Sequence, residues 1–150
     1  MSKQNDDFYQ KLRKKIRNWA QTEDGKTNKW SEYLMAAPDL FHLLCKLSID
    51  SKVSAKEKAK LIAAITYFVS PIDLVPELIL GPVGYVDDIA LAAYVLNNLI
   101  NKTDSEIVKK HWAGDKDILI LISNILAIAD EMVGVKWKEI IKKFKNSNNK

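Results

Sequence analysis

The sequence predicts an all-α fold, a single-domain bundle of six to eight helices around a central apolar helical hairpin. Apolar residues recur at helical spacing along most of the chain, and the period-two alternation typical of strands is absent. The 150 residues suffice for one domain with a sizeable core, and 47% of them are hydrophobic. We expect this domain to cover residues 1–145, followed by a polar tail at 146–150.

The N-terminal part predicts a basic amphipathic helix followed by two shorter helices. The first helix carries one apolar arc, with most Lys and Arg side chains outside it. That arc consists of Phe8, Leu12, Ile16 and Trp19. We expect Asp24-Gly25 to end this helix, and the next helix to stop before Pro38 because proline disfavours helix at the preceding residue. A leucine stripe over residues 40–47 then predicts a third helix.

The two arms of the central hairpin are predicted at residues 54–69 and 85–101. Ser54 with Glu57 is a capping-box signature at the start of the first arm. Its expected apolar face consists of Leu61, Ile62, Ile65, Phe68 and Val69. The second arm is apolar around nearly its whole circumference, so other elements must surround it. We therefore expect 85–101 to be the most buried helix.

Three further helices are expected after the hairpin. Thr103 with Glu106 is a second capping-box signature, which predicts a short helix ending near Trp112. A longer helix is expected from about Asp117 to Val133, with Gly134 at its C-terminal end. The last helix, 136–145, places Trp137, Ile140, Ile141 and Phe144 on one side and most of its lysines on the other.

The charges are sorted along the chain. The net charge is +5 over residues 1–60, −4 over 61–100 and +3 over 101–150, and the middle block contains no Lys or Arg. A block without basic residues is typical of a core or an interface. Its uncharged runs are shorter than the ~18 apolar residues of a spanning helix, so we expect no conventional transmembrane helix. The core of a bundle is favoured over an interfacial hairpin.

The connector between the two arms resembles a known family. It reads Ser-Pro-Ile-Asp-Leu-Val-Pro over 70–76 and Gly-Tyr-Val-Asp-Asp over 84–88. These motifs are similar to those of the YkvA-like family, bacterial domains of unknown function, and the resemblance covers roughly residues 61–100. Glu77 stands where the family usually has Asp. The resemblance implies a small helical domain, often described as membrane-associated, with no established reaction; Asp73, Asp87 and Asp88 are its signature acids.

Four carboxylates are candidate metal ligands: Asp73, Glu77, Asp87 and Asp88. Carboxylate oxygens suit Mg²⁺, Mn²⁺ or Ca²⁺, and no histidine lies near them that would favour zinc. The favoured interpretation is capping, because each acid falls in the first turn of a predicted helix, where it opposes the positive end of the helix dipole. We therefore expect no cofactor, with Mg²⁺ or Mn²⁺ at this cluster as the alternative.

The other reactive residue types are predicted to be structural. His42 is expected in solvent, and Cys45 is expected to be buried. His111 is expected to be a packed histidine and not a general base, because no acid or nucleophile accompanies it at a diagnostic spacing. Phosphate-binding loops, serine elbows and Cys/His metal spacings are absent from the sequence. With one cysteine and no apolar signal segment near the start, we expect a cytoplasmic protein.

Two functions from different classes follow from these observations. The first is a non-catalytic helical interaction domain whose apolar hairpin or basic terminal helices dock on a partner protein or peripherally on the anionic inner face of a membrane. A homo-oligomer is one form of that partnership. The second is binding of a divalent metal or small molecule at the acidic cluster. Nucleic-acid binding is disfavoured, because Asp6, Asp7, Glu23 and Asp24 dilute the N-terminal positive charge.

Overall fold

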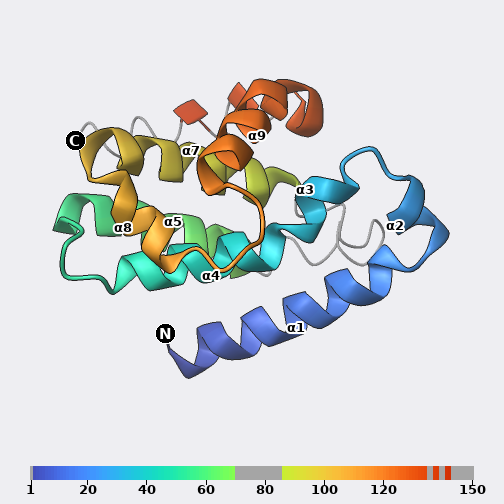
Figure 1. The fold of residues 1–150 in the computed structure, drawn as a ribbon, viewed down its shortest axis with the longest axis horizontal. Coiled ribbons are helices and arrows are strands. Elements are labelled where there is room, and N and C mark those ends of the chain that lie inside the picture. The colour runs from blue at the N-terminus through green and yellow to red at the C-terminus, as the bar shows by residue number, and fades with distance from the viewer. Residues whose placement is uncertain (1, 70–85, 135–136, 139–140, 143–150) are drawn as a thin grey trace.

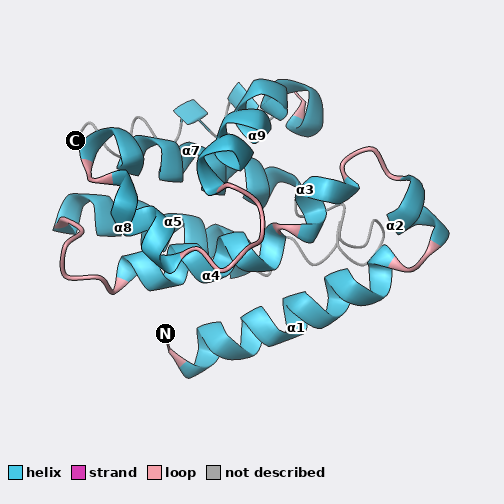
Figure 2. Cartoon of the chain, in the orientation of Figure 1, coloured by secondary structure: helices cyan, strands magenta, loops and turns pink. Residues whose placement is uncertain are grey.

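The computed structural model describes residues 2–69, 86–134, 137–138 and 141–142. These residues form eight α-helices and contain no strand, as Figure 2 shows, which confirms the predicted all-α bundle. In chain order the helices are α1 (Lys3–Ala20), α2 (Glu23–Thr27), α3 (Ser31–Met35), α4 (Ala37–Ser48), α5 (Ala55–Val69), α7 (Val86–Lys102), α8 (Ser105–His111) and α9 (Ile118–Val133). The predicted tail at 146–150 lies outside the described residues.

Helix α7 lies at the centre of the bundle, as predicted for 85–101. It packs against α3, α4, α5, α8 and α9 (Figure 1), and no residue from Val86 to Ile100 is exposed. A helix that is apolar on all sides is stable in water only when other helices cover all of its faces. The composition of α7 therefore explains its position.

Helix α5 packs against α4 and α7, so the two predicted arms lie side by side. Its start is as predicted: the hydroxyl of Ser54 accepts a hydrogen bond of 3.3 Å from the backbone N–H of Glu57. The predicted apolar face is wrong in two positions, because Ile62 is 53% exposed and Val69 is 42% exposed. The buried face consists of Leu61, Ala64, Ile65 and Phe68. Ile62 and Val69 are seven residues apart and form a separate stripe on the solvent side.

Helix α1 covers one side of the bundle with its apolar face. Leu12 and Ile16 are buried, and the ring of Phe8 contacts that of Phe41 on α4 at a centroid distance of 4.7 Å. Trp19 is partly buried against the same core. The predicted apolar arc of this helix is thus confirmed, and it is occupied by contacts within the chain.

The end of the first helix differs from the prediction. Helix α1 ends at Ala20, and Gly25 lies buried inside the short helix α2. The hydroxyl of Thr22 caps α2 by accepting a hydrogen bond of 3.1 Å from the N–H of Gly25. A Cβ atom at position 25 would overlap the carbonyl oxygen of Trp19. Glycine is needed there for the close approach of α2 to α1, not to end a helix.

The predicted end of the next helix is confirmed, because α3 ends at Met35, before Pro38. Ala37 is nevertheless helical: it begins α4, and Pro38 lies in the first turn of that helix, where its missing N–H removes no helical hydrogen bond. The cap of α8 differs from the prediction. Asp104, not Thr103, caps α8, and its carboxylate accepts a hydrogen bond of 3.0 Å from the N–H of Glu106. Gly134 ends α9 with a φ of 80°, a conformation that favours glycine, as the sequence predicts.

The four described residues beyond position 136 follow the predicted pattern of the last helix. Trp137 is buried and its ring meets that of Tyr94 on α7 edge to face, at 6.2 Å between centroids. Ile141 is partly buried, whereas Lys138 and Lys142 are exposed. Among the described helices, none combines the length and the apolar character that spanning a membrane requires.

Candidate functional site

The structure describes two of the four acids in the predicted cluster. Asp87 and Asp88 both lie in the first turn of α7, where a carboxylate opposes the positive end of the helix dipole. Asp88 is almost fully buried, at 1% exposure, and Asp87 is half-buried. Asp73 and Glu77 lie outside the described residues. Within the described part of the chain no group of three or more His, Cys, Asp or Glu side chains is placed to hold a metal ion.

A concave surface with convergent polar groups lies elsewhere in the described part of the chain, between the α3–α4 corner and the loop from α8 to α9. We call it the Trp112 lobe, a cleft of about 330 Å³. Its lining residues are Glu32, Met35, Ala36, Asp39, Trp112, Gly114, Asp115, Lys116 and Leu121. Apolar walls with a few polar groups are the usual composition of a small-molecule site. The cleft joins parts of the chain that are about eighty residues apart in sequence.

The indole of Trp112 is fixed in this lobe by its surroundings. Its Nε1 donates a hydrogen bond of 2.7 Å to the carbonyl oxygen of Lys116, which closes the loop around the ring. The backbone at Gly114 passes so close to the ring that a Cβ atom there would overlap it. Lys116 also forms an ion pair with Glu32 on α3, which ties the loop to the opposite wall. The aromatic wall is therefore held in place before any ligand arrives.

A second concavity, the Arg lobe, adjoins the first. It has a volume of about 420 Å³ and shares Met35 and Asp39 with the Trp112 lobe. Its other lining residues are Arg13, Ile16, Arg17, Ala20, Gln21 and Pro38. Met35 is 54% exposed although it is a large apolar residue, and flexible methionines are common on adaptable binding surfaces.

Asp39 lies where the two lobes meet, and charged residues of both lobes affect the pKa of its carboxyl group. Burial raises the pKa of this carboxyl above its ordinary value; the positive charges of Arg13 and His42 lower it, and the negative charge of Asp115 raises it. Burial outweighs the attraction, so the ionised form is less favourable here than in water. A carboxyl with a perturbed pKa in a cleft is a typical feature of binding and active sites.

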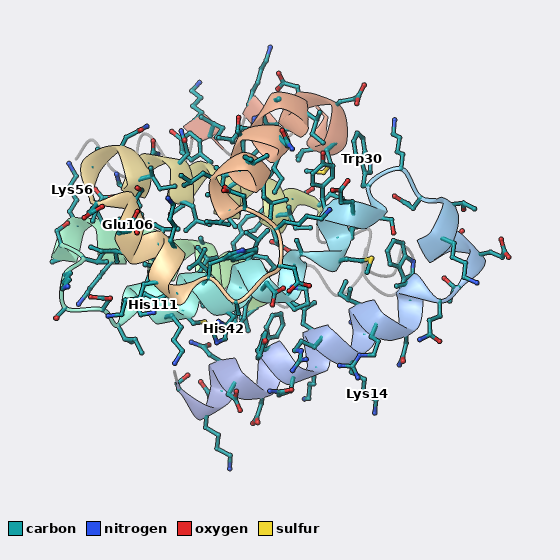
Figure 3. The ribbon with its side chains drawn as sticks, viewed as in Figure 1. Lys14, Trp30, His42, Lys56, Glu106 and His111 are labelled. Atoms are coloured by element: carbon teal, nitrogen blue, oxygen red, sulfur yellow. The ribbon has the colours of Figure 1, made fainter. Side chains whose placement is uncertain are left out.

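Two histidines lie close together on the side of the molecule where α8 meets α4 (Figure 3). His111 has an acidic partner that lies far away in the sequence: its Nε2 is 2.7 Å from a carboxylate oxygen of Asp50, sixty-one positions away. The pKa of Asp50 is lowered by this hydrogen bond and by a second one from the N–H of Lys52. His42 is half-buried, not in solvent, with its ring 5.1 Å from that of Tyr9.

The two residues with potentially nucleophilic side chains near the end of α4, which precede Asp50 in the described chain, are not activated. The hydroxyl of Ser48 donates to the carbonyl oxygen of Cys45 at 2.7 Å. Cys45 is buried, as predicted, and burial raises the pKa of its thiol to about 11. A thiol with that pKa is protonated at neutral pH and is a poor nucleophile. The geometry here favours a structural role for the pair of His111 and Asp50, which joins the α4–α5 loop to α8.

A buried ion cluster connects the start of α5 with the end of α7. Glu57 and Lys60 are each 5% exposed, and their charged atoms are 3.5 Å apart. Lys102 lies 3.8 Å from the same carboxylate. Burial lowers the pKa of Lys60, the amine of Lys102 lowers it further, and Glu57 opposes both. Because one buried carboxylate contacts the buried amine of Lys60 on α5 and the exposed amine of Lys102 on α7, this cluster links the two arms.

Comparison with known proteins places part of the chain among uncharacterised relatives. Residues 57–94, which run from the buried Glu57 into the middle of α7, match the family described as protein of unknown function (DUF1232). An uncharacterised protein, ORF9 of Methanothermobacter thermautotrophicus, is 27% identical over 105 residues, which cover 70% of this chain and 72% of that protein. No solved structure is significantly similar to the chain.

Proposed function

We propose that this chain is a non-catalytic helical interaction domain that docks peripherally on the anionic face of a membrane through the outer face of α1. The observation that carries the proposal is the charge of this helix. It holds six basic and two acidic side chains, a net charge of +4, which equals the net charge of the whole chain. Both acids lie before Phe8, so every charged residue from Lys11 to Ala20 is basic.

The basic side chains are available to a surface. Lys3, Lys11, Lys14 and Arg17 are exposed, and Figure 3 shows Lys14 on the side of α1 that faces away from the other helices. Each Lys or Arg close to an anionic bilayer contributes about 1 kcal/mol of attraction. A row of exposed basic side chains on one outer helix therefore suits binding to a flat anionic membrane surface.

The packing of α1 supports superficial contact over insertion. An amphipathic helix that inserts into a bilayer needs its apolar face for the lipid, and in α1 that face holds the buried Leu12 and Ile16. Pulling it from α4 would expose the core. Attraction that is purely electrostatic is screened within about 10 Å at 0.1 M salt, so the proposed binding is salt-sensitive.

Flotation with liposomes tests this proposal. Vesicles containing phosphatidylserine are expected to carry the protein at low salt, and vesicles of phosphatidylcholine alone are expected not to. Changing Lys3, Lys11 and Lys14 to Glu replaces three attractive charges with three repulsive ones, so the affinity should fall by more than about 3 kcal/mol, roughly 100-fold or more. These three residues line neither lobe, so the cleft remains intact in the variant.

The matched control carries the same change of charge elsewhere. Lys52, Lys56 and Lys138 are exposed and lie off α1, so replacing them with Glu alters the net charge equally. The control variant should retain most of its binding to anionic vesicles. Equal losses in the two variants would show that net charge, and not α1, drives association. Binding that survives high salt and an alkaline wash would contradict the proposal and point to an inserted segment.

The same experiment separates the membrane from a protein partner. A domain that recognises a protein alone shows no difference between anionic and neutral vesicles. The stretch 61–100 resembles the YkvA-like family, which is often described as membrane-associated, and this resemblance supports a membrane surface as the binding partner. On this proposal the protein acts at the cytoplasmic side, where anionic lipids are concentrated.

A further inference from the structure

We propose that the Trp112 lobe binds a small organic amine, with its ammonium group beside the carboxylates of Asp39 and Asp115 and its apolar body against Trp112 and Met35. The proposal goes beyond membrane docking, because it concerns a different surface. It rests on the shape of the cleft, on its fixed aromatic wall and on its charge.

The shape suits a compact ligand. A volume of about 330 Å³ is at the lower end of the range of roughly 300 to 1,000 Å³ for small-molecule sites. Leu121 is buried at the base of the α9 wall, and Ala36 contributes a short side chain that leaves space between the two walls. A single aromatic ring with a short alkyl chain fits within such a volume, and the carboxylates of the lining disfavour a nucleotide because they repel its phosphate groups.

The aromatic wall suits a cation. The face of an indole attracts an ammonium group through the ring quadrupole, with about 0.5 to 2 kcal/mol depending on exposure. Trp112 is half-buried, and its Nε1 is already engaged by the Lys116 carbonyl, so the ring offers its apolar surface and not its N–H. The chain itself shows this kind of contact, since the amine of Lys29 lies 4.7 Å from the ring centre of Trp30.

The charge of the lobe also suits a cation. Its walls carry three carboxylates and one amine, and the amine of Lys116 is paired with Glu32. Asp39 and Asp115 then face the same cleft, and their mutual repulsion is one of the causes that raise the pKa of Asp39. Arg13, which attracts Asp39 from the Arg lobe, is exposed and also lies 5.5 Å from the ring centre of Tyr9. A bound ammonium group relieves the repulsion from inside the cleft.

Three ligands of one shape and different charge test the proposal. The probes are 2-phenylethylamine, which is cationic, 2-phenylethanol, which is neutral, and 3-phenylpropanoate, which is anionic. Each is titrated into the ¹⁵N-labelled full chain while the indole N–H resonances are followed. The chain has four tryptophans, and the Trp112→Phe variant identifies the resonance of Trp112 by its loss. We expect saturable shifts of that resonance with the amine at millimolar concentration and none with the other two probes.

Three variants connect the shift to the carboxylates. Asp115→Asn and Asp39→Asn should each weaken the binding of the amine at least tenfold, which corresponds to about 1.4 kcal/mol. Asp39 is in the first turn of α4, and Asp115 is an exposed loop residue whose replacement leaves the helices intact. Asp115→Asn is therefore informative even if Asp39→Asn unfolds. The control is Asp130→Asn, at an exposed position of α9 outside the cleft, which should bind as the parent does.

Three results would overturn the proposal. The first is a shift of the Trp112 resonance that is equally large with 2-phenylethanol, because the site would then recognise shape without charge. The second is a titration of the amine that never saturates, and the third is an affinity for the amine that is the same in Asp115→Asn as in Asp130→Asn. None of these results affects membrane docking, since the probes contain no lipid and the lysines tested there line no part of this cleft.

Discussion

Helices α1 and α7 are almost equally long, with 18 and 17 residues, yet they occupy opposite environments. In α1 the buried residues are Leu12 and Ile16, whereas in α7 they include ten residues on every side of the helix. Six of the residues in α1 are basic, and α7 has no basic residue before Lys102. The position of each helix follows from the fraction of its surface that is polar and can therefore face solvent.

The two helices also differ in what they can contribute to function. All faces of α7 are used by the bundle, so a substitution there acts through stability. One face of α1 is used by the core and the rest faces solvent, so a substitution on its outer side acts through charge. Stability should therefore depend mainly on α7, and surface recognition mainly on α1.

The largest effect should come from a cavity in α7. Leu96 is fully buried, and replacing it with Ala is expected to lower the free energy of unfolding by about 2 to 5 kcal/mol, from lost transfer free energy and the cavity left behind. Lys14→Ala on the outer face of α1 should change it by no more than about 0.5 kcal/mol. Urea unfolding followed by circular dichroism measures both values.

The contrast between these two variants is the test. A loss below about 1 kcal/mol for Leu96→Ala would show that the centre of the bundle collapses around the cavity and is not tightly packed. A large loss for Lys14→Ala would show that the outer face of α1 contributes to folding. Either outcome would contradict the expectation that stability depends mainly on α7 and surface recognition mainly on α1.

Sequence patterns predict the helices well where one physical constraint dominates. The expected 85–101 helix is observed as Val86–Lys102 because its composition permits no exposed side. The start of α5 follows from Ser54 because one hydroxyl lies at the right distance before the helix. Thr103 and Asp104 are adjacent and both are good N-cap residues, so the sequence pattern does not decide between them. The structure does, because Asp104 has the extended conformation of an N-cap and its side chain accepts the capping hydrogen bond.

The cleft and the long-range pairs could not be predicted in the same way. The partner of His111 is Asp50, and the Trp112 lobe joins Asp39 to Asp115; such distant residues meet only through tertiary packing. A wheel projection places His42 opposite the leucine stripe but does not show that α1 covers it with Tyr9. Sequence reasoning finds faces of helices, whereas sites of this kind arise where several helices meet.

Helix α9 packs against α7. Removing the N-cap of α9 should lower the free energy of unfolding by less than the cavity at Leu96 does. The carboxylate of Asp117 accepts hydrogen bonds from the N–H groups of Leu119 at 2.9 Å and Ile120 at 3.1 Å. Asp117→Ala should lower the free energy of unfolding by about 1 kcal/mol, and at most about 2, because these donors lose their partner. Asp117→Asn keeps an accepting oxygen and should cost less. A larger loss for Asn than for Ala in urea unfolding would contradict capping.

The stabilising effect of the Asp50–His111 pair should be lost only at acidic pH. Because the hydrogen bonds hold the folded-state pKa of Asp50 below that of the unfolded chain, about 3.9, the pair stabilises the fold above that pH. This contribution is lost as the pH falls through the lower, folded-state value. In an NMR titration the carboxyl resonance of Asp50 should have a midpoint below the usual range for aspartate. His111→Ala should raise the pH of that titration midpoint, because it removes one of the two hydrogen bonds. Lys109→Ala on the same helix is the control; if it moves the midpoint as far as His111→Ala, the pair is not the cause.

The smallest effect is expected at the first turn of α7, where the central helix and the acidic cluster overlap. If Asp87 stabilises the start of the helix by its charge and as a hydrogen-bond acceptor, Asp87→Asn should cost a few tenths of a kcal/mol and Asp87→Ala about 1 kcal/mol. Millimolar Mg²⁺ or Mn²⁺ should then leave the melting temperature unchanged.

A metal site made of Asp73, Glu77, Asp87 and Asp88 predicts the opposite pattern. A divalent ion that binds the folded chain raises its melting temperature, and Asp87→Asn removes that increase because it removes ligand charge. Without metal the same variant becomes more stable than the parent, since neighbouring carboxylates repel one another less. Melting curves of both proteins with and without each ion therefore decide between the two interpretations. An increase in the parent that is absent in Asp87→Asn would show that the first turn of α7 is part of a site, and α7 would then contribute to function as well as to stability.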